Sequence, residues 1–286
     1  MAAADKESLP RPGASPAPTA QEYALWMSPA SIFSRQHLMQ DVEGERATLP
    51  LAAYCFMTGF IDSICFSAIF VWCAFQTGNT VQLALALARL FQGPPGQRDT
   101  SFHLADKQAL TSVLTFVFGA FLGRIGDRMG AKTRAWLFLG TFIQTLFTMS
   151  AAVTVWKSGQ PSTADARSDP AWSNALTYVT IGFMSASMGL QGIMGKRVNT
   201  QFATTIVLTT VWCELMADPK LFQLRRVVSR DHKVIGIVAL FIGGFAGRAI
   251  LDKIGSAGAL GVGTGIRLLI SVWWLFVPGK QTQTMK

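Results

Sequence analysis

A single acid inside a long apolar stretch constrains this chain more than any other feature. Residues 50–75 form an apolar segment of membrane-spanning length, and Asp62 lies near its middle. Residues 76–80, with the sequence Gln-Thr-Gly-Asn-Thr, follow as a polar interruption before apolar residues resume. Unpaired carboxylates and irregular backbone are costly at membrane depth, and they persist where they face other helices or a hydrated cavity. The pattern predicts a membrane protein with a polar path inside it.

Composition supports this class. Half of the 286 residues are hydrophobic and 14% are charged, against about 25% charged in a typical soluble domain. The net charge of +9 is concentrated in two groups, residues 124–134 and 220–233, which lie between apolar segments as cytosolic loops do. No basic-aromatic module indicates nucleic-acid binding. The expected partners are therefore the lipid bilayer and a small solute or ion.

Metal and cofactor chemistry is not expected. The four cysteines lie in apolar runs, with no CxxC pattern and no paired histidines. His37, His103 and His232 are far apart in the sequence, and no hydrolase, metalloprotease or nucleotide-binding motif occurs. The sequence thus predicts no cofactor, no metal site and no enzymatic activity.

Six stretches approach the roughly 20 residues that a helix needs to cross a bilayer. They are residues 50–75, 108–126, 134–156, 171–194, 234–253 and 257–277, and two shorter apolar stretches are Thr80–Phe91 and Phe202–Met216. If the second short stretch crosses the membrane, the two basic groups fall on opposite sides, against the positive-inside rule. If it enters and returns, both groups face the cytosol.

We therefore expect an all-α polytopic membrane protein with about six transmembrane helices, two short re-entrant or half-helix elements, and cytosolic termini. Eight spans are the alternative. The expected organisation is a disordered tail with a possible interfacial helix over 30–46, two membrane repeats, and a short C-terminal tail. Their bounds are residues 1–48, 49–157, 171–278 and 279–286, and the disorder is expected over residues 1–28.

An internal repeat accompanies this pattern. The sequence GAFLGR at 119–124 recurs as GGFAGR at 243–248, an offset of 124 residues. At similar offsets, residues 59–63 resemble residues 182–186, and residues 77–81 align with residues 204–208. If each half crosses the membrane three times, the second half has the opposite orientation to the first. Such an inverted repeat is the architecture of many secondary transporters. Chance similarity between glycine- and phenylalanine-rich helices is the alternative.

The repeated motif is best explained by helix packing. Glycines four residues apart share one helix face and let another backbone approach closely. Arg124 and Arg248 then lie at helix ends, where they anchor in headgroups or water. The expected packing residues are Gly119, Gly123, Gly243 and Gly247.

The candidate site lies around the polar interruptions. Asp62 either forms a satisfied interhelical hydrogen bond or handles an ion, proton or substrate. A half-helix starting at Asn79 or Thr80 would bind a ligand with its free N–H groups, although a plain helix cap explains the same residues. Arg267 is expected to snorkel or to pair with Asp62. The candidate substrate- or ion-binding residues are Asp62, Ser63, Gln76, Thr77, Gly78, Asn79, Thr80, Thr204 and Thr205.

The chain resembles the DUF1275 (YoaK-like, UPF0700) family of integral membrane proteins over about residues 35–277. The matching segments are 59–62, 76–80, 119–124 and 202–219. The resemblance implies a multi-span membrane protein without an assigned biochemical activity. The inverted repeat favours a small secondary transporter with a polar midplane site. A non-transporting accessory protein is the alternative, followed by an intramembrane enzyme.

Overall fold

The computed structural model describes residues 32–160, 171–198, 205–206 and 208–280. The chain divides into two units, residues 1–38 and 39–286. In the first unit, α3 (Arg35–Leu38) is a single turn. The tail expected over 1–28 lies outside the described residues. A continuous helix over 30–46 is wrong, because residues 41 and 42 form isolated β-bridges with residues 133 and 279.

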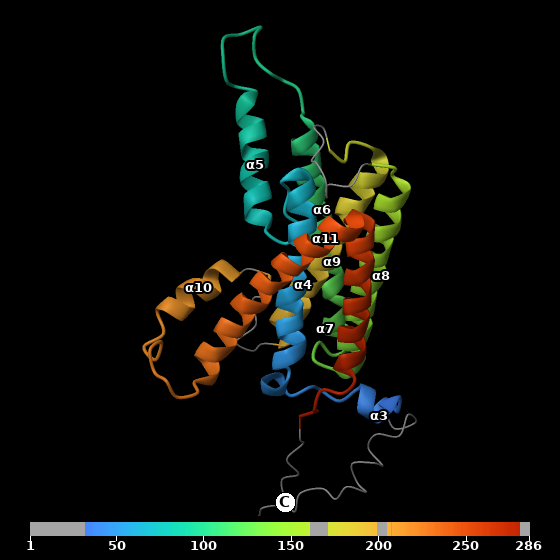
Figure 1. Cartoon of the computed structure of the whole chain (residues 1–286), viewed down its shortest axis with the longest axis vertical. Coiled ribbons are helices and arrows are strands. Elements are labelled where there is room, and N and C mark those ends of the chain that lie inside the picture. Colours follow the sequence, from blue (N-terminus) through green and yellow to red (C-terminus); the bar gives the residue numbers. More distant parts are fainter. Residues whose placement is uncertain (1–31, 161–170, 199–204, 207, 281–286) are drawn as a thin grey trace, which may run out of the picture. The chain divides into compact units, whose positions relative to one another are not determined.

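The second unit is helical, and its described residues form no named strand (Figure 1). The all-α class is thus confirmed for this part of the chain. The helices in chain order are η1 (Gly44–Arg46), α4 (Thr48–Ile69), α5 (Gln76–Arg89), α6 (Leu104–Gly123), α7 (Ile125–Met129), α8 (Arg134–Lys157), α9 (Ala175–Val198), α10 (Leu208–Met216) and α11 (Val228–Trp274).

Helix α11 consists of two arms that meet at Gly255. This residue has φ 73° and ψ 176°, which no helix contains and which a residue without a Cβ atom adopts most easily. In Figure 1 the ribbon runs through the first arm in orange and turns back through the second arm in red. The arms, residues 228–254 and 256–274, correspond to the two stretches expected at 234–253 and 257–277.

Contacts with α4 show that the two arms run in opposite directions. His232, at the start of the first arm, lies 3.2 Å from the hydroxyl of Thr48 at the start of α4. Trp274, at the end of the second arm, donates from Nε1 to the Tyr54 hydroxyl at 3.1 Å. Because both ends of α11 meet the first two turns of α4, the chain must reverse between them.

Four helices of the described residues are long and apolar enough to cross a membrane. They are Thr48–Ile69, Leu104–Met129, Arg134–Lys157 and Val228–Trp274. Helix α9 is equally long but less apolar, since it carries buried Thr, Ser and Gln side chains. Each long stretch expected as a helix contains one, but residues 70–75, 171–174 and 275–277, which lie within the expected stretches, are not helical.

The interior of the second unit is mainly apolar but also holds many polar side chains, and its outer surface carries many large apolar side chains. Exposed apolar side chains in such number are uncommon on a soluble protein, so this surface indicates that lipid surrounds the helices. Buried polar side chains include Thr58, Asn79, Ser112, Gln144, Gln191 and Arg267. Large exposed apolar side chains include Phe118, Phe121, Val153, Phe241, Phe245 and Leu269.

One end of the bundle gathers the start of α4, the loop around α7 and the end of α11. Asp41 forms an isolated bridge with Thr133, directly before α8. The Nε of Arg134 donates to the carbonyl oxygen of Val277 at 2.9 Å. Three segments that are distant in sequence are thereby joined at this end.

Both groups of basic residues lie at this end, which we call the basic end. Arg197, at the end of α9, donates from Nε and Nη2 to the two carboxylate oxygens of Asp127 in α7, each at 2.8 Å. The 220–233 group lies at the same end, because His232 contacts Thr48 at the start of α4. Both basic groups therefore lie at one end of the bundle.

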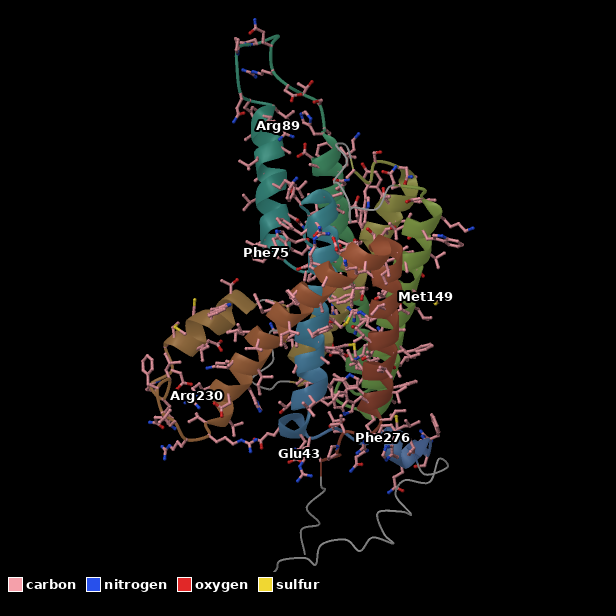
Figure 2. All side chains as sticks on the ribbon, in the orientation of Figure 1. Glu43, Phe75, Arg89, Met149, Arg230 and Phe276 are labelled. Carbon is pink, nitrogen blue, oxygen red and sulfur yellow. The ribbon has the colours of Figure 1, made fainter. Side chains whose placement is uncertain are left out.

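The opposite end carries the loop between α5 and α6. Figure 2 shows Arg89 at this end, and Glu43 and Phe276 at the basic end. The Arg89 guanidinium forms an ion pair with the buried carboxylate of Asp106, close to the start of α6. This pair fixes the end of α5 to α6.

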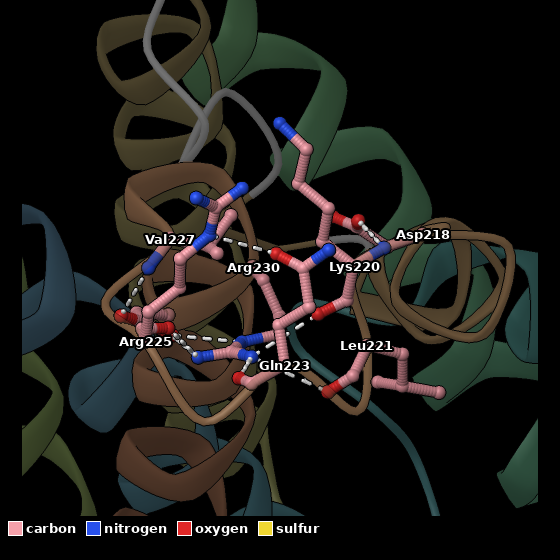
Figure 3. Close-up of polar contacts among 8 residues, drawn as sticks. Asp218, Lys220, Leu221, Gln223, Arg225, Val227 and Arg230 are labelled. Carbon is pink, nitrogen blue, oxygen red and sulfur yellow. Dashed lines mark hydrogen bonds and ion pairs between the residues drawn. The ribbon is translucent and has the colours of Figure 1, made fainter.

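Arg230 organises the loop between α10 and α11 (Figure 3). Its Nη1 donates to the carbonyl oxygens of Lys220 at 3.1 Å and Leu221 at 3.3 Å, and its Nη2 to that of Arg225 at 3.1 Å. It also pairs with Asp231 at 2.6 Å. One guanidinium thus donates to several carbonyls of this loop, among them that of Lys220, which also accepts from the Gln223 N–H at 3.1 Å.

The four motif glycines lie where helices approach closely. A Cβ atom at any of them would collide with the neighbouring helix, with backbone at Gly119 and Gly243 and first with a side chain at Gly123 and Gly247. The nearest residues are Ala186 for Gly119, Ile193 for Gly123, Phe56 for Gly243 and Ser63 for Gly247.

The crossings correct the alignment of the two halves. A Cβ atom at Gly59 would collide with the backbone carbonyl of Leu240, and one at Gly189 with that of Phe116. Leu240 and Phe116 are separated by 124 residues, the offset of the repeated motif. By contacts, the counterpart of Gly59 is therefore Gly189 and not Gly182. A shift of seven residues is two helical turns, which preserves the face and hides the error in the sequence.

Candidate functional site

The first interruption lies earlier than the sequence indicated. Residues 76–80 form the first turn of α5, whereas the irregular backbone covers residues 70–75. Phe70 ends α4 in the left-handed conformation, with φ 55°. The expectation of a half-helix beginning at Asn79 or Thr80 was wrong, because an apolar aromatic sequence gave no local sign of a break. The break depends on partners elsewhere in the chain.

Asp62 supplies one set of these partners. Its side chain is buried, and its Oδ1 accepts hydrogen bonds from the backbone N–H groups of Cys73 at 2.7 Å and Ala74 at 2.9 Å. A carboxylate oxygen that accepts two backbone N–H groups compensates for their missing helical acceptors. Asp62 therefore positions the irregular backbone.

Asn79 supplies the second set. Its Oδ1 accepts from the Trp72 N–H at 3.2 Å, while Nδ2 donates to the Trp72 carbonyl at 2.7 Å and to Gln76 Oε1 at 2.9 Å. Ser112 of α6 donates to the same carbonyl at 2.7 Å and lies 2.9 Å from the Ser185 hydroxyl of α9. The Asn79 side chain thus provides the Trp72 backbone with the hydrogen bonds that a continuous helix would have provided.

We call Asp62, Gln76, Asn79 and Ser112 the break cluster. Apart from the contact between Ser112 and Ser185 of α9, the hydrogen bonds named above join its members to one another or to the irregular backbone. None of its members has a fully buried polar atom without a partner, as far as the chain is described.

Asn79 and Thr80 are not cap residues, because α5 begins at Gln76 and its cap residue, Phe75, makes no side-chain cap hydrogen bond. The plain-cap interpretation of these two residues is therefore wrong, and the cluster instead holds the irregular backbone before α5.

The other polar residues of this stretch lie outside the cluster. The hydroxyls of Ser63 and Thr80 donate to backbone carbonyls of their own helices, at 2.9 and 2.8 Å. Thr77 is exposed, and Gly78 lies against the ring of Phe75. Of the residues expected here, Asp62, Gln76 and Asn79 converge, whereas Ser63, Thr77, Gly78 and Thr80 do not join them.

The second interruption is fixed to the same helix. Thr204 lies outside the described residues, but Thr205 is buried and its carbonyl accepts from the Thr58 hydroxyl at 2.9 Å. Gln191 of α9 donates from Nε2 to the same hydroxyl at 2.9 Å. Thr58 and Asp62 are four residues apart on α4, so successive turns of one helix hold the two interruptions.

Arg267 lies elsewhere than expected. Its side chain is fully buried, so it does not snorkel to an interface. Its Nη1 donates to Gln144 Oε1 of α8, and no ion pair with Asp62 occurs among the described residues. The second arm of α11 faces α8, and this placement directs the guanidinium toward Gln144.

Tyr54 lies beside this arginine and links the surrounding helices. Its hydroxyl is 2.5 Å from the Thr141 hydroxyl of α8 and accepts from Trp274 Nε1 at 3.1 Å. Its carbonyl accepts from Gln191 Nε2 at 3.0 Å. The Arg267 charge is close enough to interact electrostatically with Tyr54.

We call Tyr54, Thr58, Gln144, Gln191, Thr205 and Arg267 the central cluster. It contains buried polar atoms for which the described residues provide no hydrogen-bond partner: Gln191 Oε1, Thr205 Oγ1, Arg267 Nε and Arg267 Nη2. Such atoms are uncommon in folded proteins and often mark binding positions.

Sequence reasoning missed Tyr54, Thr58, Gln144 and Gln191. The available signal was the presence of two glutamines inside apolar helices, where amides need partners. Threonine and tyrosine gave no signal, because threonine commonly bonds to its own helix and tyrosine is common in membrane segments.

An exposed group of Asp99, Ser101 and His103 is not arranged as a catalytic relay. His103 Nε2 lies 2.7 Å from Asp99 Oδ2 and 3.2 Å from Ser101 Oγ. A relay needs the acid and the nucleophile on different ring nitrogens. Here Ser101, Asp99 and Asp106 instead surround the start of α6, where the His103 N–H donates to Asp106 at 3.1 Å.

Comparison with known proteins identifies the family but no activity. No curated protein and no solved structure matches the chain. One family model matches residues 51–273, which include both clusters and all of α11 except Trp274. The chain belongs to the family described as "Protein of unknown function (DUF1275)".

Proposed function

We propose that this protein is a small secondary carrier whose solute path passes through the central cluster. The observation that carries the proposal is the attachment of both interrupted segments to α4, by Thr58 and Asp62, beside buried polar atoms without protein partners. Interrupted helices that meet inside a bundle are the usual binding places of secondary transporters. No enzymatic step is part of the proposal.

The proposed topology has six crossings, formed by α4, α6, α8, α9 and the two arms of α11. Helices α5 and α10 have 14 and 9 residues, fewer than a straight crossing needs. Both basic groups lie at one end of the bundle, which would be the cytosolic end. The close contact at Gly59 and its counterpart at Gly189 supports an inverted repeat.

Alternating access can be tested without knowing the solute. Thr205→Cys changes a buried side chain whose hydroxyl has no partner among the described residues, so the fold should tolerate it. The parent protein carries Cys213→Ser, because Cys213 is exposed whereas Cys55, Cys65 and Cys73 are buried. A charged thiol reagent is applied to sealed vesicles of each orientation.

A carrier exposes its central position to each side in turn, so the reagent should label Thr205→Cys from both sides and the parent from neither. Ser187→Cys, at another buried hydroxyl without a partner among the described residues, serves as a second position. Labelling of both variants from one side alone, or from neither side, contradicts the carrier.

A non-transporting accessory protein is the second candidate, and the break cluster favours it. The polar groups of that cluster bond to one another and to backbone, as structural groups do. An accessory protein would keep the central cluster closed, so neither cysteine variant would be labelled in folded protein.

A further inference from the structure

Arg267 is a buried cation for which the described residues provide no ion-pair partner. It lies in the second arm of α11 and is fully buried. Its Nη1 donates a hydrogen bond to the neutral amide of Gln144, whereas Nε and Nη2 have no partner among the described residues. A buried guanidinium without an anion is far less stable than one that is paired. An anionic partner would neutralise the guanidinium and accept hydrogen bonds from Nε and Nη2.

The two free atoms form one edge of the guanidinium. The N–H groups of Nε and Nη2 are parallel and match the two oxygens of a carboxylate. Arg197 uses this same edge, with both atoms 2.8 Å from the oxygens of Asp127. Arg230 directs the same edge to Asp231, at 2.9 and 2.6 Å. At Arg267, the described residues offer no carboxylate to this edge.

We infer that Arg267 binds the carboxylate of a small monocarboxylate solute through its Nε and Nη2 edge. This inference deepens the carrier proposal and rests on it for the solute's passage. In its bound state the solute would neutralise the guanidinium and complete the hydrogen bonds that the protein leaves open.

The charge distribution favours one carboxylate over two. The other buried cations of the described residues are Arg134 and Lys233. Arg134 donates to the carbonyl of Val277, and Lys233 lies 3.9 Å from Glu214, so both are engaged near the basic end. A second carboxylate beside Arg267 would lack a cation.

The packing beside Arg267 limits the size of the solute. Gly263 precedes Arg267 by one helical turn on the same face of the arm. A Cβ atom at Gly263 would lie 3.0 Å from the ring of Phe60 and 3.6 Å from the terminal methyl of Met57, so apolar side chains already fill this face. A solute bound at Arg267 would therefore have to be small.

Thermal unfolding of the full chain in detergent tests the inference, with sodium propionate as the probe. Propionate should raise the melting temperature by a few degrees in a saturable manner, because a ligand stabilises the state that binds it. Sodium chloride, sodium phosphate and sodium succinate at equal ionic strength are the references. The inference is overturned if propionate has no effect or if any reference raises the melting temperature as much.

Variants assign the effect to the arginine. Arg267→Gln and Arg267→Lys should each weaken the apparent affinity for propionate at least tenfold, because neither side chain retains the charged fork. Arg197→Gln is the matched control, since it removes the same edge from an exposed pair, and its propionate response should equal that of the wild type. An unchanged response of Arg267→Lys overturns the inference.

Gln144→Glu covers the case in which the arginine variants do not fold. It places an internal carboxylate on the Nη1 side of Arg267 and retains the guanidinium. The variant should fold and lose most of its propionate response, and a full response overturns the inference.

Binding and transport separate the two proposals. Propionate stabilisation without labelling of Thr205→Cys from both sides contradicts the carrier and leaves the anion site intact. Labelling from both sides without a propionate effect contradicts the anion site alone.

Discussion

The break cluster and the central cluster are both polar, both largely buried and both attached to α4, but they differ in whether their buried polar atoms have partners. In the break cluster, Asp62 and Asn79 bond directly to the irregular backbone. In the central cluster, Gln191, Thr205 and Arg267 retain buried atoms for which the described residues offer no partner. A polar side chain inside a bundle therefore does not by itself indicate binding. Hydrogen-bond satisfaction separates a structural group from a candidate ligand contact.

The largest loss of stability is expected from a substitution in the break cluster. Asp62→Ala removes the acceptor of two buried backbone N–H groups, each of which costs about 1–3 kcal/mol when left unsatisfied, or about 2–6 kcal/mol together. The melting temperature of the detergent-purified chain measures the loss. Asp62→Asn retains one acceptor oxygen, so its loss should be smaller. If Asp62→Ala melts like the wild type, the positioning role is wrong.

In the central cluster we expect a substitution that raises the stability of the chain instead of lowering it. Thr205→Val replaces a buried hydroxyl without a partner among the described residues by a methyl group of similar shape, and should stabilise the chain by about 1 kcal/mol. Thr58→Val is the matched control, because the Thr58 hydroxyl donates to the Thr205 carbonyl. It should destabilise by about 1–2 kcal/mol. Equal effects of the two variants on the melting temperature would remove the distinction between satisfied and unsatisfied groups.

The smallest effect is expected at the exposed pair that resembles the site inferred at Arg267. The hydrogen bond from Arg197, and then its charge, lower the pKa of Asp127 below its ordinary value. The pair therefore contributes fully above the unfolded carboxyl's pKa of about 3.9, and its contribution is lost as pH falls through the lower pKa of the folded state. Because both side chains are exposed, the loss should be small.

Melting temperatures of the wild type and Asp127→Asn, compared between pH 6 and pH 3, measure this contribution. The difference between the two proteins should be small at pH 6 and should disappear toward pH 3. A difference that grows as the pH falls would show that the pair does not have the expected sign.

Much of the fold could be predicted from the sequence because hydrophobic runs and charge placement are local properties. The six long helical stretches and two short ones follow from run length, and the gathering of basic groups at one end follows from their positions between runs. The site was predicted only in part. Asp62 and Asn79 stood out as polar residues in apolar surroundings, whereas Gly182 was matched wrongly because a shift of two turns leaves a helix pattern unchanged.

The sequence by itself determined an all-helical chain with membrane-like helices, since each helix satisfies its own backbone and the apolar runs require burial in lipid or protein. The tertiary structure alone decided where α4 ends, because the carboxylate of Asp62 and the amide of Asn79 bind irregular backbone that lies 12 and 7 residues away from them in the sequence. It also decided that Arg267 faces Gln144 and not Asp62. Partners of buried polar groups come from other helices, and no local pattern specifies which helix will lie beside which.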